Sequence, residues 1–265
     1  MIPSLCRALI SDRDMGGRTK IKGGLNVQSV IQVKNLYKLY YLGEETVRAL
    51  DGVDFEIKKG EFCAIVGTSG SGKSTLLNML AGLEKPTKGE VVISGHHLER
   101  MNEEQLVSFR RRRVGFIFQA YQLIASMDAE ENVALPLNFR GVKRSERTAK
   151  ARLMLERVKL GKYRKHFPNQ MSGGQQQRVG VARALVSDPE IIFADEPTGN
   201  LDSRTSREIM ALMQKVVKEQ GCTLVMVTHD PQLASWADRI IKVIDGKIVS
   251  IEVKKKESTE DEEMV

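Results

Sequence analysis

Residues 67–74 constrain the fold of this chain more than any other segment. They match the pattern GxxxxGK[ST] and lie between an apolar run at 62–66 and a helical pattern that starts at Lys73: Gly67, Thr68, Ser69, Gly70, Ser71, Gly72, Lys73 and Ser74. Glycines allow backbone N–H groups to surround phosphate oxygens, and a helix N-terminus attracts negative charge. Lys73 would then reach the β- and γ-phosphates of a nucleotide, and the Ser74 hydroxyl would bind Mg²⁺. A Gly- and Ser-rich loop with an incidental lysine is the alternative, but it would not require this strand–helix context.

A second apolar run, Ile191–Ala194, ends in two carboxylates, Asp195 and Glu196. A carboxylate at the C-terminal end of a strand beside a phosphate loop can hold Mg²⁺ directly or through water, which suits Asp195. Glu196 follows outside the strand, where it can polarise a water molecule for attack on the γ-phosphorus. Taken alone, an exposed acidic pair in a loop is the simpler explanation. The phosphate loop in the same chain favours the metal and catalytic roles.

The segment Ser172-Gly173-Gly174-Gln175 precedes another helical pattern. Ser172 is a favourable N-cap residue, so helix initiation explains part of this pattern. The same residues would also form a second helix N-terminus that faces phosphate. Since residues 67–74 already surround one triphosphate, this second loop would have to approach from the opposite side. That geometry predicts that a second copy of the chain supplies it.

Strand and helix patterns alternate along the chain and predict an α/β core with a parallel sheet. Short apolar runs at 62–66, 191–194 and 223–228 are typical of strands that are covered on both faces. The Asp245-Gly246 pair predicts a hairpin between two C-terminal strands. Residues 102–187 are mainly helical and are interpreted as an insertion, in which Leu153, Leu155 and Val158 belong to one helical segment.

Composition restricts the class of protein without defining it. The chain has 265 residues, 41 of them basic and 34 acidic, and residues 97–170 hold sixteen of the basic and eight of the acidic ones. A solvated helical face is the usual cause of such a surplus, and a face that contacts a membrane partner or anionic headgroups is the alternative. Nucleic acid is not expected, because no aromatic residues are interleaved with the basic run. No apolar run approaches the roughly 18 residues of a membrane-spanning helix.

The three cysteines have neither disulfide-framework nor metal-ligand spacing: Cys6, Cys63 and Cys222. Two of them, Cys63 and Cys222, lie beside apolar strand-like runs, where a free buried thiol is the usual explanation. This usage predicts a reducing, cytosolic compartment.

Further motifs follow in a fixed order around the phosphate loop and the Asp195-Glu196 pair. They are Gln119 after the predicted strand 114–118, Ser172-Gly-Gly-Gln175, Gly199-Asn-Leu-Asp202, Thr228-His229-Asp230, and Tyr40 near the N-terminus. Over about residues 29–253 this order resembles the ATP-binding cassette (ABC) ATPases of ABC transporters. The resemblance implies a P-loop NTPase core with a mostly parallel sheet, an N-terminal antiparallel β subdomain and an inserted α-helical subdomain at about 102–187. Residues 1–28 are then expected to be a loosely ordered extension, and residues 254–265 a charged C-terminal tail.

The resemblance also implies roles for individual residues. Tyr40 would stack on adenine, although Tyr37 and Tyr41 are close neighbours and an ordinary strand tyrosine is the alternative. Gln119 would sense Mg²⁺ and the attacking water, and His229 would contact the γ-phosphate. The phosphate loop would extend to Thr75, the signature loop Ser172–Gln175 would close on ATP held by the other subunit, and Asp202 would link the two sites. Met171 departs from the leucine that is usual at that position. Because methionine is apolar and of similar volume, this replacement should preserve function.

Several softer clues resemble the lipoprotein-release, macrolide-export and peptide-antibiotic-resistance group within this family. These segments are 43–50, 118–124 and 131–136. The resemblance implies an ATP-hydrolysing subunit that uses ATP and Mg²⁺, dimerises head to tail and drives a separate integral-membrane permease from the cytoplasmic face of the membrane. A cell-division-type regulatory ATPase acting through a membrane partner is the first alternative. A soluble ABC ATPase acting on ribosomes or nucleic acid is the second, but this chain carries one cassette and no long coiled-coil insertion.

Overall fold

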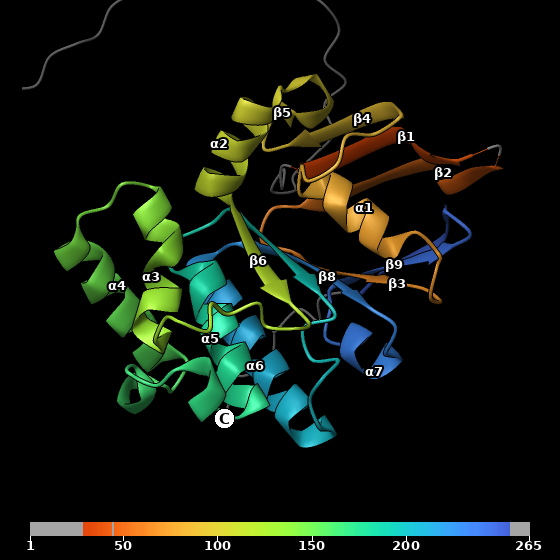
Figure 1. Cartoon of the computed structure of the whole chain (residues 1–265). Coiled ribbons are helices and arrows are strands. Elements are labelled where there is room, and N and C mark those ends of the chain that lie inside the picture. The colour runs from red at the N-terminus through yellow and green to blue at the C-terminus, as the bar shows by residue number, and fades with distance from the viewer. Residues whose placement is uncertain (1–28, 44, 255–265) are drawn as a thin grey trace, which may run out of the picture.

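The computed structural model describes residues 29–43 and 45–254, which form two β-sheets and the helices that cover them (Figure 1). The expected extension at 1–28, with Cys6, lies outside the described residues, as does the expected tail beyond Lys254.

The larger sheet has six strands in the order β10-β9-β3-β8-β7-β6. These strands are β3 (Phe62–Val66), β6 (Val114–Phe118), β7 (Ile191–Asp195), β8 (Thr223–Thr228), β9 (Arg239–Ile244) and β10 (Lys247–Val253). All neighbouring pairs run parallel except β9 and β10. Asp245 and Gly246 join that pair with φ of 47° and 73°, two left-handed residues as a type I′ turn requires. The predicted mostly parallel sheet and C-terminal hairpin are therefore confirmed.

The smaller sheet is antiparallel, with the order β2-β1-β4-β5, and it confirms the expected N-terminal β subdomain. Its strands are β1 (Ser29–Leu42), β2 (Glu45–Lys58), β4 (Lys88–Ile93) and β5 (His96–His97). In β2 the side chains alternate: Val53, Phe55 and Ile57 are buried, whereas Asp54 and Glu56 are exposed. One face of this sheet therefore packs on the core and the other meets solvent.

Helices cover both faces of the six-stranded sheet. They are α1 (Lys73–Leu80), α2 (Glu103–Arg113), α3 (Ala129–Phe139), α4 (Arg144–Arg157), α5 (Gly173–Leu185), α6 (Ser203–Gln220) and α7 (Pro231–Ala234). Short 3₁₀ turns lie at Leu98–Arg100, Gly161–Tyr163 and Pro168–Gln170. Because side chains alternate along a strand, Cys63 and Ile65 of β3 share one core with α1, α2 and the smaller sheet. Ala64 shares the opposite core with α3, α4, α5 and α6.

The boundary expected at residue 102 for the helical insertion does not match the observed packing. Strand β6 lies inside the interval 102–187 and forms an edge of the six-stranded sheet. Helix α2 packs with the smaller sheet through Leu106 and Phe109. Only α3 and α4 form a layer away from the sheet (Figure 1). Helical periodicity alone cannot distinguish α2, which completes one core, from helices that begin another.

Leu153 and Leu155 lie in α4 and Val158 is its C-cap residue, so the expected helical segment is confirmed, although the Leu153 side chain is 59 % exposed. The buried positions of α4 and the turn after it are Ala151, Met154, Leu155 and Val158. These follow the spacing i, i+3, i+4 and i+7 of a helix face, and position 153 lies off that face.

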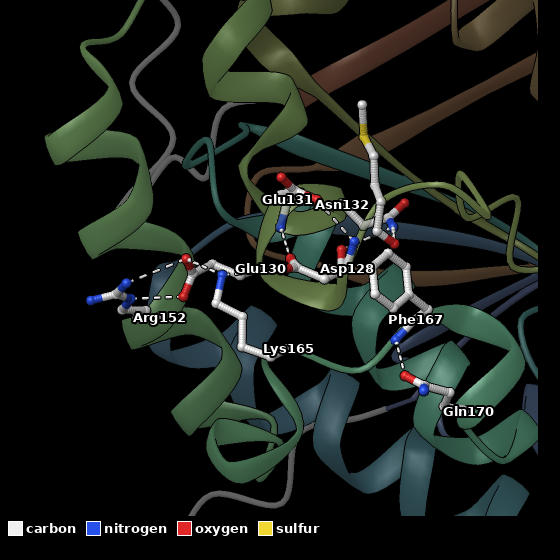
Figure 2. A network of polar contacts seen from close by, with 9 residues as sticks. Asp128, Glu130, Glu131, Asn132, Arg152, Lys165, Phe167 and Gln170 are labelled. Atoms are coloured by element: carbon white, nitrogen blue, oxygen red, sulfur yellow. Dashed lines mark hydrogen bonds and ion pairs between the residues drawn. The ribbon is translucent and has the colours of Figure 1, made fainter.

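Part of the basic surplus of residues 97–170 stabilises the domain itself. Lys165 bridges two carboxylates at the N-terminus of α3, at 3.0 Å from Asp128 and 3.2 Å from Glu130 (Figure 2). Arg152 of α4 donates to Glu130 over 2.7 Å. Asp128 also caps α3 by accepting from the Glu131 amide at 2.8 Å. These contacts fasten α3 to α4 and to the segment that leads to Ser172.

Candidate functional site

The predicted site residues follow the C-terminal ends of four neighbouring parallel strands. The phosphate loop follows β3, His229 follows β8, Asp195 ends β7 and Gln119 follows β6. Since these strands are adjacent in the order β3-β8-β7-β6, their ends form one edge of the sheet. Ligands of open α/β sheets bind at this edge.

The phosphate loop joins β3 to α1. Lys73 is buried, and its Nζ donates to the carbonyl of Thr68 over 2.6 Å. This hydrogen bond joins the end of the phosphate loop to its beginning. Helix α1 has no side-chain cap and no acidic residue in its first turn, so its N-terminal amides are free to bind an anion. The Ser71 hydroxyl is buried and has no hydrogen-bond partner within residues 29–43 and 45–254. These donors are suited to the phosphates of a nucleotide.

Gly72 shows why this loop needs glycine. Its φ is 95°, and a Cβ at this position would lie 2.2 Å from the Ala49 carbonyl oxygen of β2. Both the backbone conformation and the close approach therefore exclude a side chain.

Asp195 and Glu196 end β7 in different environments. The pKa of the Asp195 carboxyl is raised, mainly by burial and also by the neighbouring charge of Glu196. The charge of Lys73 lowers this pKa but does not reverse the shift. Glu196 has a left-handed φ of 42°, and its Oε1 lies 2.8 Å from Nδ1 of His229. The structure thus brings these two predicted catalytic residues into contact. Asp195 remains half-buried beside the phosphate loop lysine.

Gln119 lies at the end of β6 and pairs with a residue that the sequence did not indicate. Its Nε2 donates to Asn200 Oδ1 over 3.3 Å, and Asn200 Nδ2 donates to the Gln119 carbonyl over 3.1 Å. A Cβ on Gly199 would lie 2.8 Å from Gln119 Nε2, so the glycine admits this side chain. The Gln119 loop therefore lies against the segment that leads to Asp202.

Ser172 and Gln175 form a reciprocal cap at the start of α5. The Ser172 hydroxyl accepts from the Gln175 amide over 3.3 Å, and the Gln175 side chain accepts from the Ser172 amide over 2.9 Å. The N-cap interpretation of this motif is confirmed. Gly173 and Gly174 form the first turn. Met171 is buried in the same core as α5, as expected for an apolar replacement.

Asp202 and Tyr40 have structural contacts of their own. Asp202 caps α6 by accepting from the amides of Arg204 and Thr205, each over 3.0 Å, and hydrogen bonds from Thr205 lower the pKa of this carboxyl. Tyr40 lies half-buried on β1, and its hydroxyl donates to Glu84 over 2.6 Å. This bond fixes the orientation of the ring on the β subdomain.

A cavity of about 420 Å³ adjoins the Glu196–His229 pair. Its walls include Thr198, Ser206 and Trp236, the only tryptophan of the chain. The Thr198 hydroxyl is buried and has no partner among the described residues. The cavity gives the catalytic pair a polar, recessed surround.

The side chains at the strand ends offer donors and acceptors for a nucleotide. In the described part of the chain, no group of three or more His, Cys, Asp or Glu side chains could hold a metal ion. The Ser74 hydroxyl, the Gln119 amide and the Asp195 carboxylate are oxygen ligands of the kind that Mg²⁺ prefers, and nucleotide phosphates usually complete such sites. Fold and site together define a nucleotide-binding α/β ATPase of the P-loop class.

Comparison with known proteins identifies the family. The family model described as ABC transporter matches residues 50–199. An uncharacterized ABC transporter ATP-binding protein of Thermotoga maritima is 48 % identical over 226 residues, which are 85 % of this chain and 96 % of that protein. The lipoprotein-releasing system ATP-binding protein LolD of Chromohalobacter salexigens is 44 % identical over 84 % of this chain and 94 % of its own length. The chain belongs to the ABC transporter family of ATP-binding proteins, and it is an ABC-type ATPase.

Two further matches bear on assembly. The macrolide export ATP-binding/permease protein MacB of Hyphomonas neptunium is 48 % identical, and this chain covers 34 % of its length. Among solved structures, the dimeric post-hydrolysis state of the ATP-binding cassette MJ0796, bound to ADP and Pi, has a TM-score of 0.79 and 44 % identity. That match covers 85 % of this chain and 99 % of the other.

Proposed function

We propose that two copies of this chain bind two ATP molecules between them, head to tail, and use ATP hydrolysis to drive an integral-membrane permease. The observation that carries this proposal is the placement of two phosphate-facing loops. The loop at 67–74 begins α1 on one face of the sheet, whereas Ser172 begins α5 on the opposite face (Figure 1). Two such loops can close on one triphosphate only if a second copy supplies one of them. The MJ0796 cassette, whose solved structure is dimeric, supports this arrangement.

Within each composite site, the residues of one copy divide the work. Lys73, Ser74, Thr75 and backbone amides of the loop Gly67–Gly72 hold the phosphates, and Tyr40 stacks on adenine. Asp195, Ser74 and Gln119 would hold Mg²⁺, which would supply positive charge to neutralise the phosphates. Glu196 takes a proton from the attacking water, and His229, already 2.8 Å from Glu196, keeps that carboxylate oriented and contacts the γ-phosphate.

The partner copy completes the same site. Ser172, Gly173, Gly174 and Gln175 face the γ-phosphate from the opposite side, with the α5 N-terminus adding its positive dipole end. Asp202, at the start of α6, links the two sites across the dimer. Closure of the two copies on ATP is the conformational change that drives the permease, and ATP hydrolysis allows the two copies to separate again.

An apolar groove supports a membrane partner. It encloses about 400 Å³ between α2, β6, α3 and α5, and it reaches Phe118, the residue before Gln119. Phe139 on its rim is 63 % exposed and Val107 is 51 % exposed. Exposed apolar side chains around a groove are typical of a protein–protein contact. The permease would bind here and hold the ATPase at the cytoplasmic face of the membrane.

The comparisons support the proposal that this ATPase acts together with a permease. MacB joins ATP-binding and permease parts under one name, and this chain matches about a third of that protein. Residues 29–253 would therefore be the ATPase domain of a transporter whose membrane part lies elsewhere. In the region that the structure describes, no helix is long and apolar enough to cross a membrane. A regulatory ATPase acting through a membrane partner would share every site residue, so the partner decides between the two.

The test is affinity capture of the Glu196→Gln protein from detergent-solubilised membranes with Mg-ATP, followed by mass spectrometry. A stoichiometric polytopic permease is the expected result. Its extracytoplasmic domain would separate lipoprotein release, macrolide export and peptide resistance from a regulatory role. Ribosomal proteins or nucleic acid in its place would refute the proposal.

A further inference from the structure

One arginine of α5 holds the loop that carries Gln119. Arg183 donates from Nη2 to the Tyr121 carbonyl over 2.8 Å and from Nη1 to the Gln122 carbonyl over 2.6 Å. Burial lowers the pKa of this guanidinium, and no neighbouring carboxylate offsets that effect among the described residues. Arg183 is partly buried, and a desolvated cation whose two partners are both loop carbonyls is costly to maintain unless those bonds are strong.

The loop conformation depends on these two bonds. Tyr121 has a φ of 59° and Gln122 a φ of 47°, both in the left-handed region. Side chains other than glycine rarely adopt this region, because their Cβ crowds the backbone. The left-handed pair directs both carbonyls at one guanidinium, and two charge-assisted hydrogen bonds help to offset the backbone strain.

The same loop packs on the start of α5. A Cβ on Gly173 would lie 2.7 Å from the Tyr121 hydroxyl, so the signature glycine leaves room for that side chain. The loop therefore meets α5 at two levels, at Gly173 in its first turn and at Arg183 near its end. Because α5 is one continuous helix of 13 residues, a displacement of Ser172 moves Arg183 with it.

A second anchor holds the other end of the loop. Asn132 of α3 is fully buried, and its side chain accepts from the Ile124 amide over 2.8 Å. Its Nδ2 donates to the carbonyls of Ile124, Met127 and Asp128 over 3.0–3.1 Å. Asp128 is in turn tied to Lys165 (Figure 2). The loop is thus hydrogen-bonded to α3 through Asn132 and to α5 through Arg183, while Gln119 contacts Asn200.

We infer that Arg183 is a positioning residue that makes the placement of Gln119 in one composite site depend on the placement of the Ser172 loop in the other. This inference rests on the proposed function, since it needs Ser172 to face the nucleotide of the partner copy. When α5 moves onto that nucleotide, Arg183 carries the carbonyls of Tyr121 and Gln122 with it. Because Gln119 is two residues before Tyr121, it moves with these carbonyls toward the nucleotide bound by its own copy.

The test compares Arg183→Gln with a matched arginine. Arg140 donates to the carbonyls of Arg111, Arg112 and Ser187, each over 2.7 Å, and burial also lowers its pKa, but it does not touch the Gln119 loop. Arg140→Gln therefore reproduces the loss of a partly buried arginine whose guanidinium bonds backbone carbonyls. Each variant is characterised by thermal unfolding, monomer affinity for a fluorescent ATP analogue, and kcat and KM of ATP hydrolysis. ATP-driven dimerisation is measured with Glu196→Gln added to each variant.

For Arg183→Gln we expect monomer nucleotide affinity within about twofold of the parent, because the phosphate loop is untouched. We expect kcat to fall roughly tenfold and the ATP concentration for half-maximal dimerisation to rise roughly tenfold, corresponding to about 1.4 kcal/mol. Arg140→Gln, with a similar fall in Tm, should retain kcat. Arg183→Lys, which can bond one carbonyl, should be intermediate, and it provides the test if Arg183→Gln does not fold.

Three outcomes would count against this assignment. A wild-type kcat in Arg183→Gln, or in Arg183→Lys where Gln does not fold, overturns it. Equal losses of kcat in the Arg183 and Arg140 variants reduce Arg183 to a stabilising residue and also overturn it. If the Glu196→Gln parent, with Arg183 intact, stays monomeric in Mg-ATP, the proposed function itself fails and the inference fails with it.

Discussion

Replacing Glu196 by glutamine separates the two tasks that the site geometry assigns to this residue. The amide keeps the shape of the carboxyl and can still bond His229, now 2.8 Å away, so the local structure should be preserved. It cannot accept a proton from water. It also removes a negative charge that, together with burial, raises the pKa of Asp195. The variant should therefore hydrolyse poorly while its Asp195 carboxyl ionises more readily and binds Mg-ATP at least as well.

The expected magnitude follows from the role of a general base. Loss of proton transfer by a positioned side chain costs about 10²–10⁴ in rate, or roughly 3–5 kcal/mol in the barrier. Dimerisation has no such cost, because Glu196 is not part of the phosphate loop or of the Ser172 loop. With Mg-ATP the variant should therefore accumulate as a dimer, at roughly twice the 29.7 kDa of one chain.

Size-exclusion chromatography with light scattering measures the dimer, and a phosphate-release assay measures hydrolysis. Glu208→Gln is the matched control, since Glu208 is an exposed carboxylate of α6 that pairs with Arg178 and Arg204. This control should hydrolyse ATP at the wild-type rate. A Glu196→Gln protein that stays monomeric with Mg-ATP, or that retains more than about a tenth of the wild-type rate, would refute the assigned role.

Three further variants test the site and the loop around it. Gly72→Ala should abolish nucleotide binding in a fluorescent-nucleotide titration, because its Cβ would lie 2.2 Å from the Ala49 carbonyl oxygen; a normal Kd would contradict this. Asn132→Ala should lower the free energy of unfolding in urea by about 2–4 kcal/mol, because the buried hydrogen-bonding groups of its loop lose their partner, and a loss below about 1 kcal/mol would be inconsistent with that. Asp195→Asn should lose Mg²⁺-dependent hydrolysis yet raise the free energy of unfolding of the nucleotide-free protein at pH 7, measured in urea, by less than about 1 kcal/mol because the group is only half-buried. Since folding raises the pKa of Asp195, this gain should grow as pH rises through that pKa and vanish below about pH 3.9, and a gain that persists at acid pH would exclude a charge effect.

The sequence predicted the strand ends of the site because each of them carries a local signal. An apolar run such as 62–66 can only be a covered strand, and the glycines and lysine after it require a turn into a helix. Asp245-Gly246 needs two left-handed residues, which places a hairpin between two chain segments without any tertiary information. Signals of this kind depend on the backbone conformation of a few residues, so they can be interpreted without knowledge of the tertiary structure.

Layer membership could not be predicted in the same way. Leu106 and Phe109 of α2 have the same helical spacing as the apolar residues of α4, yet they pack into different cores. What separates them is β6, a five-residue strand at the edge of the sheet. The sequence predicts a strand at 114–118 inside the interval 102–187, but it does not predict that this strand divides α2 from the helices of the other core.

The pairing of side chains across the site was also beyond the sequence, for a geometric reason. Parallel order brings the ends of β6, β7 and β8 to one edge, so a glutamine, two carboxylates and a histidine are expected near one another. Which of them touch depends on backbone angles beyond the strands: the left-handed φ of Glu196 is what turns its carboxyl toward His229. Gln119 meets Asn200, 81 positions away in the sequence, next to Gly199, which leaves room for the end of the Gln119 side chain. Contacts of this kind follow from the assembled sheet edge, and for that reason substitutions at Asn200 and Arg183 will report on the coupling between loops that no single motif contains.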